Sequence, residues 1–307
     1  LNPFGARTIN LEKSAVPLTE AGNLRSIIHF IPDTENTALS RINGGQYVAS
    51  YIPKIQKADL ELYNAGKAGK WLAETKRDQE DPEDQDQLFL LGATKTFKHL
   101  ALDSVERSNG DFKGQPMMAV LKADVDRLGM IFSKGLGDKV SIGRYSTLSR
   151  QMDLFFKGIL PKTMANPEEK YSEFRNIYTI YAGGDDLLLA GPWTTMFNFA
   201  LYLNEAFTRY VCNNPEVTIS AGLIIMRHNY PLAQAASDAE KALEKAKHSG
   251  RNRVCVSNEV LLWPDFEKAC EDAEFLDKAM TEQGHEGVRL TRGFVYRLLQ
   301  YYTMAKD

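Results

Sequence analysis

The sequence predicts an α+β fold built on a βαββαβ unit, and three observations predict it. Short runs of aliphatic, aromatic and β-branched residues alternate with longer segments of helical periodicity from Pro116 onward. Gly183 and Gly184 separate two of these runs as a hairpin turn does, because glycine enters positive φ without steric cost. Acidic residues follow two of the runs directly. Together these features indicate a sheet with carboxylates at one edge.

The elements of the unit can be assigned in chain order from the length and pattern of each segment. The expected order is strand 117–125, helix about 145–160, strand 177–182, strand 186–190, helix 193–211 and strand 217–225. This is the ferredoxin-like arrangement, in which the first and third strands are neighbours in one sheet.

Further elements follow the unit. Alanines and leucines predict a helix over 231–248, with Gly250 as its C-terminal stop, and a strand at 253–256. Residues 258–282 and 287–305 have the pattern of two amphipathic helices. An aromatic and aliphatic set in the second helix could form a stacking surface, but helical core packing is the favoured interpretation. The residues of this set are Phe294, Tyr296, Leu298, Leu299 and Tyr301.

Residues 1–97 carry fewer signals. Strands are expected at 27–31 and 46–52, separated by turn-rich sequence. Residues 78–87 contain six acids and a proline. A metal site or an RNA mimic is conceivable there, but such a segment cannot bury enough apolar surface to become ordered, so a solvated mobile loop is expected.

The acidic pair Asp185–Asp186 is expected at the tip of the Gly-Gly hairpin. A solvated turn is the structural alternative, since Asp is a preferred turn residue. Asp124 ends the first strand, and the strand order brings it beside this pair. Mg²⁺ binds one or two carboxylates and substrate phosphates, and two such ions can drive phosphoryl transfer. The pattern therefore predicts a two-metal site, with Asp126 facing away as a helper.

A third segment, ALEKAKHSGRNRV at 242–254, concentrates cations near the end of a helix. Cations there can simply complement the helix dipole, and this explanation covers Lys245 well. It does not account for the immediate turn into a strand at Arg253.

Composition indicates a protein of the cytoplasm. The 307 residues are 43% hydrophobic and 25% charged, with a net charge of −3 that gives no global attraction to nucleic acid. The three cysteines form no Cys-x-x-Cys pair and are expected to be reduced thiols. No apolar run approaches the length of a membrane span, so no membrane partner is expected. The chain begins at Leu1, which suggests part of a longer polypeptide.

Four segments together resemble the palm domain shared by GGDEF-class nucleotide cyclases and the large subunit of type III CRISPR effector complexes. They are LKADVDRLG, the YAGGDD hairpin, TISAGLIIM at 218–226 and the ALEKAKHSGRNRV tail. Two details differ from a diguanylate cyclase. The hairpin is GGDD followed by Leu187, where such a cyclase would have an acid and then Phe, and Phe132 stands where it would have a guanine-reading Asn. The Arg-x-x-Asp inhibition motif is missing, since Arg175 is followed three residues later by Tyr178. The phrases YVASYIPK, TFKHLA and LKADVDRLGMIFSKGL resemble the type III-A subunit.

The resemblance implies a nucleotidyltransferase that joins ATP into cyclic oligoadenylates with Mg²⁺ or Mn²⁺. It implies partners as well: other subunits of the effector complex, and crRNA and target RNA held through that complex. The catalytic metal ligands would be Asp124, Asp185 and Asp186, with the Val125 carbonyl as a further ligand. The nucleotide-binding residues would be Gly183, Gly184, Lys247 and Arg251, the last two holding the triphosphate.

The resemblance also divides the chain. Residues 1–97 would be a small α/β linker domain with the mobile acidic loop, 98–257 the GGDD palm, and 258–307 an incomplete helical domain. None of the five histidines is followed by Asp, so no histidine–aspartate nuclease is expected in this chain. A diguanylate cyclase and a catalytically idle nucleotide-binding scaffold remain as alternatives.

Overall fold

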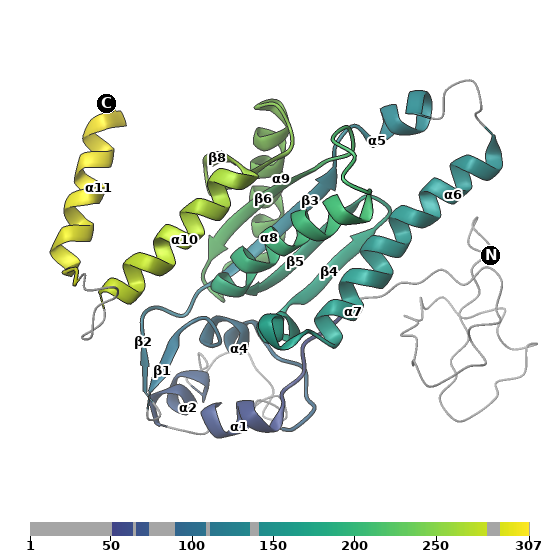
Figure 1. Cartoon of the computed structure of the whole chain (residues 1–307). Helices are drawn as coiled ribbons and strands as arrows, with labels where there is room; N and C mark the ends of the chain where they lie inside the picture. The colour runs from purple at the N-terminus through teal and green to yellow at the C-terminus, as the bar shows by residue number, and fades with distance from the viewer. Residues whose placement is uncertain are drawn as a thin grey trace, which may run out of the picture.

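The computed structural model describes residues 51–63, 66–73, 90–108, 111–135, 141–280 and 289–306. Its centre is a sheet with the order β4-β5-β3-β6-β7-β8 (Figure 1). The strands are β3 (Met118–Val125), β4 (Tyr178–Gly183), β5 (Asp186–Pro192), β6 (Ile219–Met226), β7 (Arg253–Val256) and β8 (Glu259–Leu262). All neighbours are antiparallel except β6 and β7, which are parallel.

The strands β3 to β6 of this sheet confirm the ferredoxin-like prediction. β3 lies between β5 and β6, and β4 lies outside β5. This order follows from the two-residue turn between β4 and β5, because a turn that short forces the two strands to pair as a hairpin. β7 and β8 then extend the sheet beyond the ferredoxin-like core.

One face of the sheet is covered by α8 (Trp193–Tyr210), α10 (Trp263–Ala279) and the helical stretch that begins with α6 (Ile142–Asp153) (Figure 1). Every second residue of β3 points to this face, because side chains alternate along a strand. These β3 residues join the phenylalanines of the helices in the main core. The buried residues concerned are Ala119, Leu121, Ala123, Val125, Phe155, Phe156, Phe199 and Phe207.

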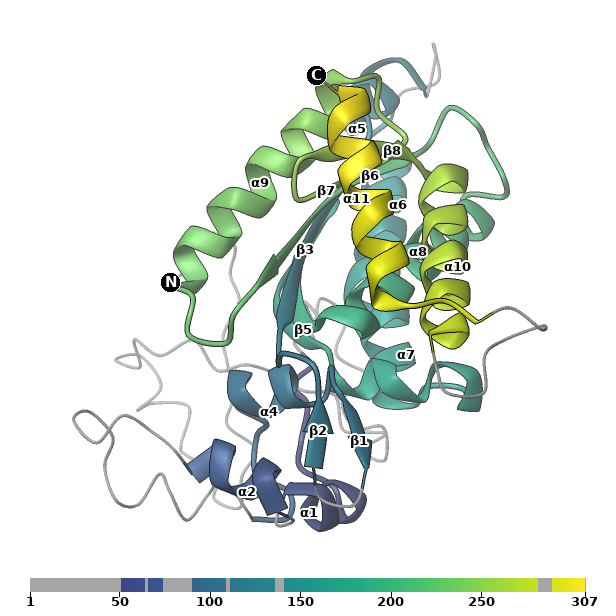
Figure 2. The same ribbon diagram turned by 90° about the vertical axis from the view of Figure 1, so that its left-hand side faces the viewer.

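The opposite face of the sheet is covered by α9 (Leu232–His248), as Figure 2 shows. Gly222 of β6 allows the close approach, since a Cβ there would collide with the backbone of Ala239 and Leu243. The alanines of α9 pack on Met118 and Val120 of β3. The last turn of α9 therefore lies beside the end of β3 and the start of β6.

A smaller cluster lies below the sheet in Figure 1. It contains α1 (Lys57–Tyr63), α2 (Gly66–Ala73), α4 (Phe97–Leu102), β1 (Glu106–Ser108) and β2 (Asp111–Lys113). Lys95 is buried here, and its Nζ lies 3.0 Å from Asp59, 2.8 Å from Asp103 and 2.9 Å from Asn176 Oδ1. Because Asn176 ends the 3₁₀ segment Glu169–Asn176, this buried cation ties the cluster to the sheet domain.

Several N-terminal expectations fall outside the described residues. The strand expected at 27–31 and the acidic run 78–87 lie there entirely. Of the strand expected at 46–52, only Tyr51 and Ile52 are described, and they are not in a strand. The Tyr51 carbonyl nevertheless accepts a hydrogen bond of 2.9 Å from the Thr179 amide of β4.

Two helix assignments were wrong in their extent. The segment expected as one helix over 145–160 is longer: α6 continues into a π-helical turn (Leu154–Ile159) and then α7 (Leu160–Ala165). Residues 258–282 do not form a single helix, because β8 pairs with β7 and α10 begins only at Trp263. Pro264 at the start of α10 explains this boundary, since proline is favoured in the first turn of a helix.

The last helix, α11 (Arg292–Lys306), also corrects an expectation. Its aromatic and aliphatic residues were expected to pack in a core, yet Tyr296 is 68% and Tyr301 66% exposed in the described part of the chain. Two short segments, α5 (Leu128–Met130) and a π-helical turn (Ile131–Gly135), follow β3. Within the described residues, no helix is long and apolar enough to cross a membrane.

Candidate active site at the acidic edge of the sheet

Strand pairing brings the three predicted carboxylates to one edge of the sheet. Asp124 of β3 is directly opposite Asp186 of β5. Opposite residues of an antiparallel pair face the same side, with Cβ atoms about 4.5–5.5 Å apart. The Asp185 carbonyl accepts a hydrogen bond of 3.1 Å from the Val125 amide, so the hairpin turn is fixed to the end of β3.

The hairpin differs slightly from its prediction. Its two turn residues are Gly184 and Asp185, whereas Asp186 already belongs to β5. Gly184 has a φ of 38°, which glycine adopts at little cost. The Gly184 amide donates a hydrogen bond of 3.2 Å to Asp153 of α6, and the Tyr181 ring lies where a side chain at Gly183 would be. The turn is therefore held from the helix side.

Two lysines oppose the acidic charge on this face. The Lys247 Nζ, from the last turn of α9, lies 2.7 Å from Asp124 Oδ2 and 3.4 Å from Glu244. Lys122 of β3 forms an ion pair with Glu240 of α9. Lys247, which was predicted to hold the triphosphate, is thus paired with Asp124.

The surroundings raise the pKa of all three acids. Burial is the main cause for each, because it disfavours the charged form. Lys247 opposes the rise of the Asp124 pKa, and Lys122 opposes that of the Asp186 pKa, while neighbouring carboxylates add to the rise. Asp186 adds directly to the raised pKa of Asp185. Burial and the neighbouring carboxylates together therefore outweigh the lysines in setting the direction of these pKa values.

Tyr181 contributes to the same edge. Burial raises the pKa of its phenol, and the charge of Asp186 raises it further. Its hydrogen bond with Asp186 acts in turn to lower the pKa of that carboxyl. The Tyr181 hydroxyl thus stabilises the ionised form of one candidate metal ligand.

Asp126 has a different role from Asp124. It is only 2% exposed, and its carboxylate accepts hydrogen bonds of 2.7 Å from Ser220 and Thr218 and 2.9 Å from the Asn252 amide. The expectation that Asp126 faces away from Asp124 was wrong: Ser220, which binds it, pairs with Asp124 across β3 and β6. Residues two apart share one face of a strand, so the geometry follows the ordinary alternation.

Arg251 lies in the turn that Asp126 anchors. Its φ is 64° and that of Asn252 is 50°, both left-handed, and the Arg251 amide donates to the Ala246 carbonyl at 3.2 Å. Within the described ranges, the Arg251 guanidinium has no hydrogen-bond or ion-pair partner. The Arg251 guanidinium thus lies on the segment that is bonded to Asp126, directly after β3.

The donor chemistry of this edge fits a hard divalent cation. In the described part of the chain, no three His, Cys, Asp or Glu side chains form a ready-made metal cluster. Mg²⁺, however, takes only one or two protein carboxylates and keeps several waters. The Asp124 carboxylate already forms an ion pair with one cationic group, the Lys247 ammonium. The ligands would be Asp124, Asp185 and Asp186, with Val125 contributing only through its carbonyl, since its side chain is in the core.

Sequence reasoning missed Lys122, Glu240 and Tyr181. The signal for Lys122 was its place two residues before Asp124, which puts both on one face of β3. Glu240 precedes Lys247 by seven residues, or two helical turns, so both face the sheet from α9. Lys122 and Glu240 could therefore be placed at this site only after the faces of the strand and the helix had been assigned.

Two pockets lie away from the acidic edge. One of about 200 Å³ is lined by Trp71, Gln115, Pro116, Arg227, His228 and Asn229. The other, of about 730 Å³, lies among α8, α10 and the 3₁₀ segment that ends at Asn176. Neither is lined by the three candidate acids.

The six-stranded sheet and the helices that cover it are consistent with a palm fold, and a palm domain suggests an enzyme of the nucleotidyl-transfer type. Residues 117–255 match the family model described as Cas10/Cmr2, second palm domain. Over this region the chain is similar to the Cas10/Csm1 large subunits of subtype III-A CRISPR systems.

Individual relatives show the same similarity. The chain is 39% identical over 157 residues to a protein of Methanocaldococcus jannaschii named CRISPR system single-strand-specific deoxyribonuclease Cas10/Csm1 (subtype III-A), a match that covers 50% of this chain and 19% of that protein. Among solved structures, a Csm1-Csm4 cassette in complex with AMPPNP matches with 27% identity and a TM-score of 0.53. The same cassette with pppApA gives 27% and 0.52. Each covers 68% of this chain and 30% of the solved chain.

The chain thus spans about a fifth of that curated relative's length.

Proposed function

We propose that this chain carries the catalytic palm of a type III-A large subunit and joins ATP through 3′–5′ linkages into cyclic oligoadenylates. The observation that carries the proposal is the register of β3 and β5, which sets Asp124 opposite Asp186 with Asp185 in the adjoining turn. The solved relatives with AMPPNP and pppApA support adenine nucleotides as its ligands.

The reaction is a nucleotidyl transfer. A ribose 3′-hydroxyl attacks the α-phosphate of a second ATP; a bond forms between that oxygen and phosphorus, the bond to the β-phosphate bridge breaks, and pyrophosphate leaves. Two Mg²⁺ or Mn²⁺ ions would supply activation of the hydroxyl and stabilisation of the leaving oxygen. Asp124, Asp185 and Asp186 would hold them, with the Val125 carbonyl.

The cations of the third segment complete the site. Lys247 would leave Asp124 and contact the triphosphate as a point charge, while Arg251 would bind phosphate oxygens through its planar fork. Of the two glycines predicted to bind nucleotide, Gly184 would provide room but no amide donor, because its amide is already bonded to Asp153, whereas the space beside Gly183 is filled by the Tyr181 ring. Release of Lys247 would expose the Asp124 oxygen that it now contacts.

The partners follow from the same assignment. We propose that the palm works with other subunits of the effector complex, and that crRNA paired to target RNA, held by the complex, switches synthesis on. The Csm1-Csm4 cassettes among the solved relatives support a subunit partner of the Csm4 kind.

A second candidate is a nucleotide-binding scaffold without turnover. The ion pair between Lys247 and Asp124 favours it, since that contact neutralises one candidate metal ligand. Incubation of the assembled, target-bound complex with ATP or GTP and Mg²⁺ or Mn²⁺, followed by mass analysis, separates the candidates. Cyclic oligoadenylates from ATP are expected. Bound but unchanged ATP would indicate the scaffold, and a cyclic dinucleotide from GTP a diguanylate cyclase.

A further inference from the structure

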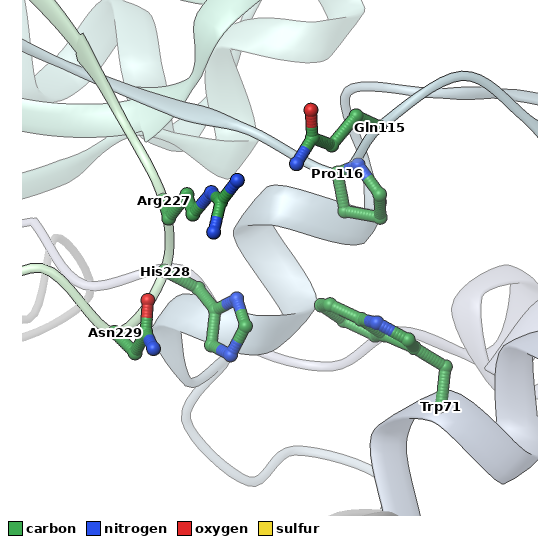
Figure 3. Close-up of a pocket in the computed structure, with 6 residues that line it drawn as sticks. All are labelled: Trp71, Gln115, Pro116, Arg227, His228 and Asn229. Carbon is green, nitrogen blue, oxygen red and sulfur yellow. The ribbon is translucent and has the colours of Figure 1, made fainter.

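A pocket of about 200 Å³ lies at the end of the sheet opposite the acidic edge (Figure 3). Three separate parts of the chain form it: Trp71 comes from α2, Gln115 and Pro116 from the segment before β3, and Arg227 with its two successors from the turn between β6 and α9. Figure 3 shows Trp71 and His228 on one side and Arg227 with Gln115 on the other.

This pocket is separate from the candidate active site. The segments that line it flank the Met118–Met226 pair, whereas the acidic edge begins at the Asp124–Ser220 pair of the same two strands. Six residues of an antiparallel strand span about 20 Å. A ligand in the pocket would therefore not contact the carboxylates.

The aromatic part of the pocket is held in place by its neighbours. The Trp71 indole lies edge to face with His228, with ring centroids 5.0 Å apart, and with Phe112 at 6.4 Å. The Lys98 Nζ lies 5.6 Å from the indole centroid. Ring contacts such as these hold an indole in a fixed orientation. A fixed aromatic ring can stack a nucleobase whatever the base is.

The polar part of the pocket has unused hydrogen-bonding capacity. The side chains of Gln115, Arg227 and Asn229 make no hydrogen bond or ion pair within the described ranges. All three line the pocket: in Figure 3, Gln115 extends toward Arg227, and Asn229 lies beside His228. Amides match the donor and acceptor groups of a base edge, and a guanidinium matches a phosphate.

Cationic side chains lie on or against the elements that line the pocket, although the whole chain carries −3. α2 contains Lys67 and Lys70 and no acid, and Lys98 and Arg227 add to them. Burial, and then the charge of Lys98, lowers the pKa of His228. The neutral form of the imidazole is thereby favoured, and this form can both donate and accept a hydrogen bond.

We propose that this pocket binds one nucleotide, with its base stacked on Trp71 and its phosphate on Arg227. The volume of about 200 Å³ is below the roughly 300–1,000 Å³ of pockets for drug-sized ligands, so it suits a single base. The nucleotide is either free or part of a single-stranded RNA, and both share this chemistry. An aromatic platform beside a cationic groove is the usual arrangement for single-stranded nucleic acid.

The test measures binding of a fluorescein-labelled, ten-nucleotide RNA of adenosine and uridine to the 307-residue chain by anisotropy. EDTA is present, so that metal-dependent binding at the acidic edge does not contribute. Trp71→Ala is expected to weaken binding at least about fivefold through lost stacking, and Trp71→Phe to keep most of it. Arg227→Gln should weaken binding and reduce its salt dependence. The matched control is Arg297→Gln on α11, which removes the same charge elsewhere.

AMP as a competitor separates the two sources. Displacement of the RNA by AMP identifies a site for a free nucleotide, and Trp71-dependent RNA binding that AMP does not displace identifies a site for a strand. Equal affinity of wild type, Trp71→Ala and Arg227→Gln, with Arg297→Gln as reference, would overturn the proposal and leave a protein surface as the interpretation of this pocket. Thermal melting of each variant shows whether it is folded, and Arg227→Gln decides if Trp71→Ala is not.

Discussion

Asp124 lies near the end of β3 and Asp126 directly follows that strand on the same side, yet their surroundings differ completely. Asp126 is buried, and Ser220, Thr218 and Asn252 donate to its carboxylate. Asp124 is partly open and is paired with the ammonium of one lysine. The neutral donors around Asp126 make it a structural anchor for the turn at Asn252. Asp124 is a candidate metal ligand, because another cation can replace the ammonium that it contacts. The partners of a carboxylate, not its place in a motif, thus distinguish the two roles.

The largest expected effect concerns the open carboxylates. Asp185→Ala with Asp186→Ala should lower oligoadenylate synthesis by the assembled complex at least about 100-fold, because the charge stabilisation of phosphoryl transfer is lost. The fold should remain intact, as judged by circular dichroism. Near-normal synthesis by this double variant would refute the assignment of the hairpin.

The comparison of the two aspartates predicts opposite phenotypes. Asp126→Ala should lower the free energy of unfolding by about 2–4 kcal/mol, since it leaves buried donors of Ser220 and Asn252 unpaired. Asp124→Ala should cost about 1 kcal/mol or less, because its ion pair is partly exposed. Urea unfolding of both variants provides the measurement. A larger loss for Asp124→Ala would reverse the anchor and ligand roles of the two residues.

Lys247 and Arg251 test whether the site around Asp124 binds the triphosphate of ATP. If they hold the triphosphate, Lys247→Gln or Arg251→Gln should weaken ATP binding by about 1.5–3 kcal/mol for each charged hydrogen bond lost, with little change for AMP. If they only complement the helix dipole, each change should cost a few tenths of a kcal/mol in stability and leave nucleotide binding unchanged. Calorimetry with both nucleotides separates the cases, and an equal loss for ATP and AMP counts against the triphosphate role.

The smallest effect is a dependence of stability on pH. The folded-state pKa values of Asp185 and Asp186 are raised, so their contribution to stability is greatest below the ordinary carboxyl pKa of about 4 and is lost as pH rises through the folded values. Asp185→Asn with Asp186→Asn should therefore raise the melting temperature of the metal-free protein at pH 7, and less so at pH 4. A stabilisation that grows toward pH 4 would contradict the raised pKa values.

The sequence was sufficient for the part of the fold that local signals determine. The Gly-Gly turn and the short apolar runs predicted the hairpin, and the βαββαβ order then placed Asp124 beside Asp186, as the register confirms. The metal, nucleotide and domain assignments stay predictions. The hairpin of β7 and β8 was missed, because the run Glu259–Leu262 carries no periodicity that separates a short strand from the start of a helix.

Other features depended on tertiary contacts that no local pattern records. The anchoring role of Asp126 requires Asn252, which is 126 residues away. The pocket at Trp71 joins three distant segments of the chain. The exposure of α11 contradicts its amphipathic pattern, because periodicity shows which face of a helix is apolar but not what covers it.

A crystal structure of the chain with ATP and Mn²⁺ tests the central claim most directly, because the anomalous signal of manganese locates the metal without assumption. We predict manganese between Asp124 and the hairpin acids, with the Lys247 ammonium moved from Asp124 to the triphosphate. Manganese bound elsewhere, or a triphosphate bound while Lys247 keeps its contact with Asp124, would contradict the two-metal assignment.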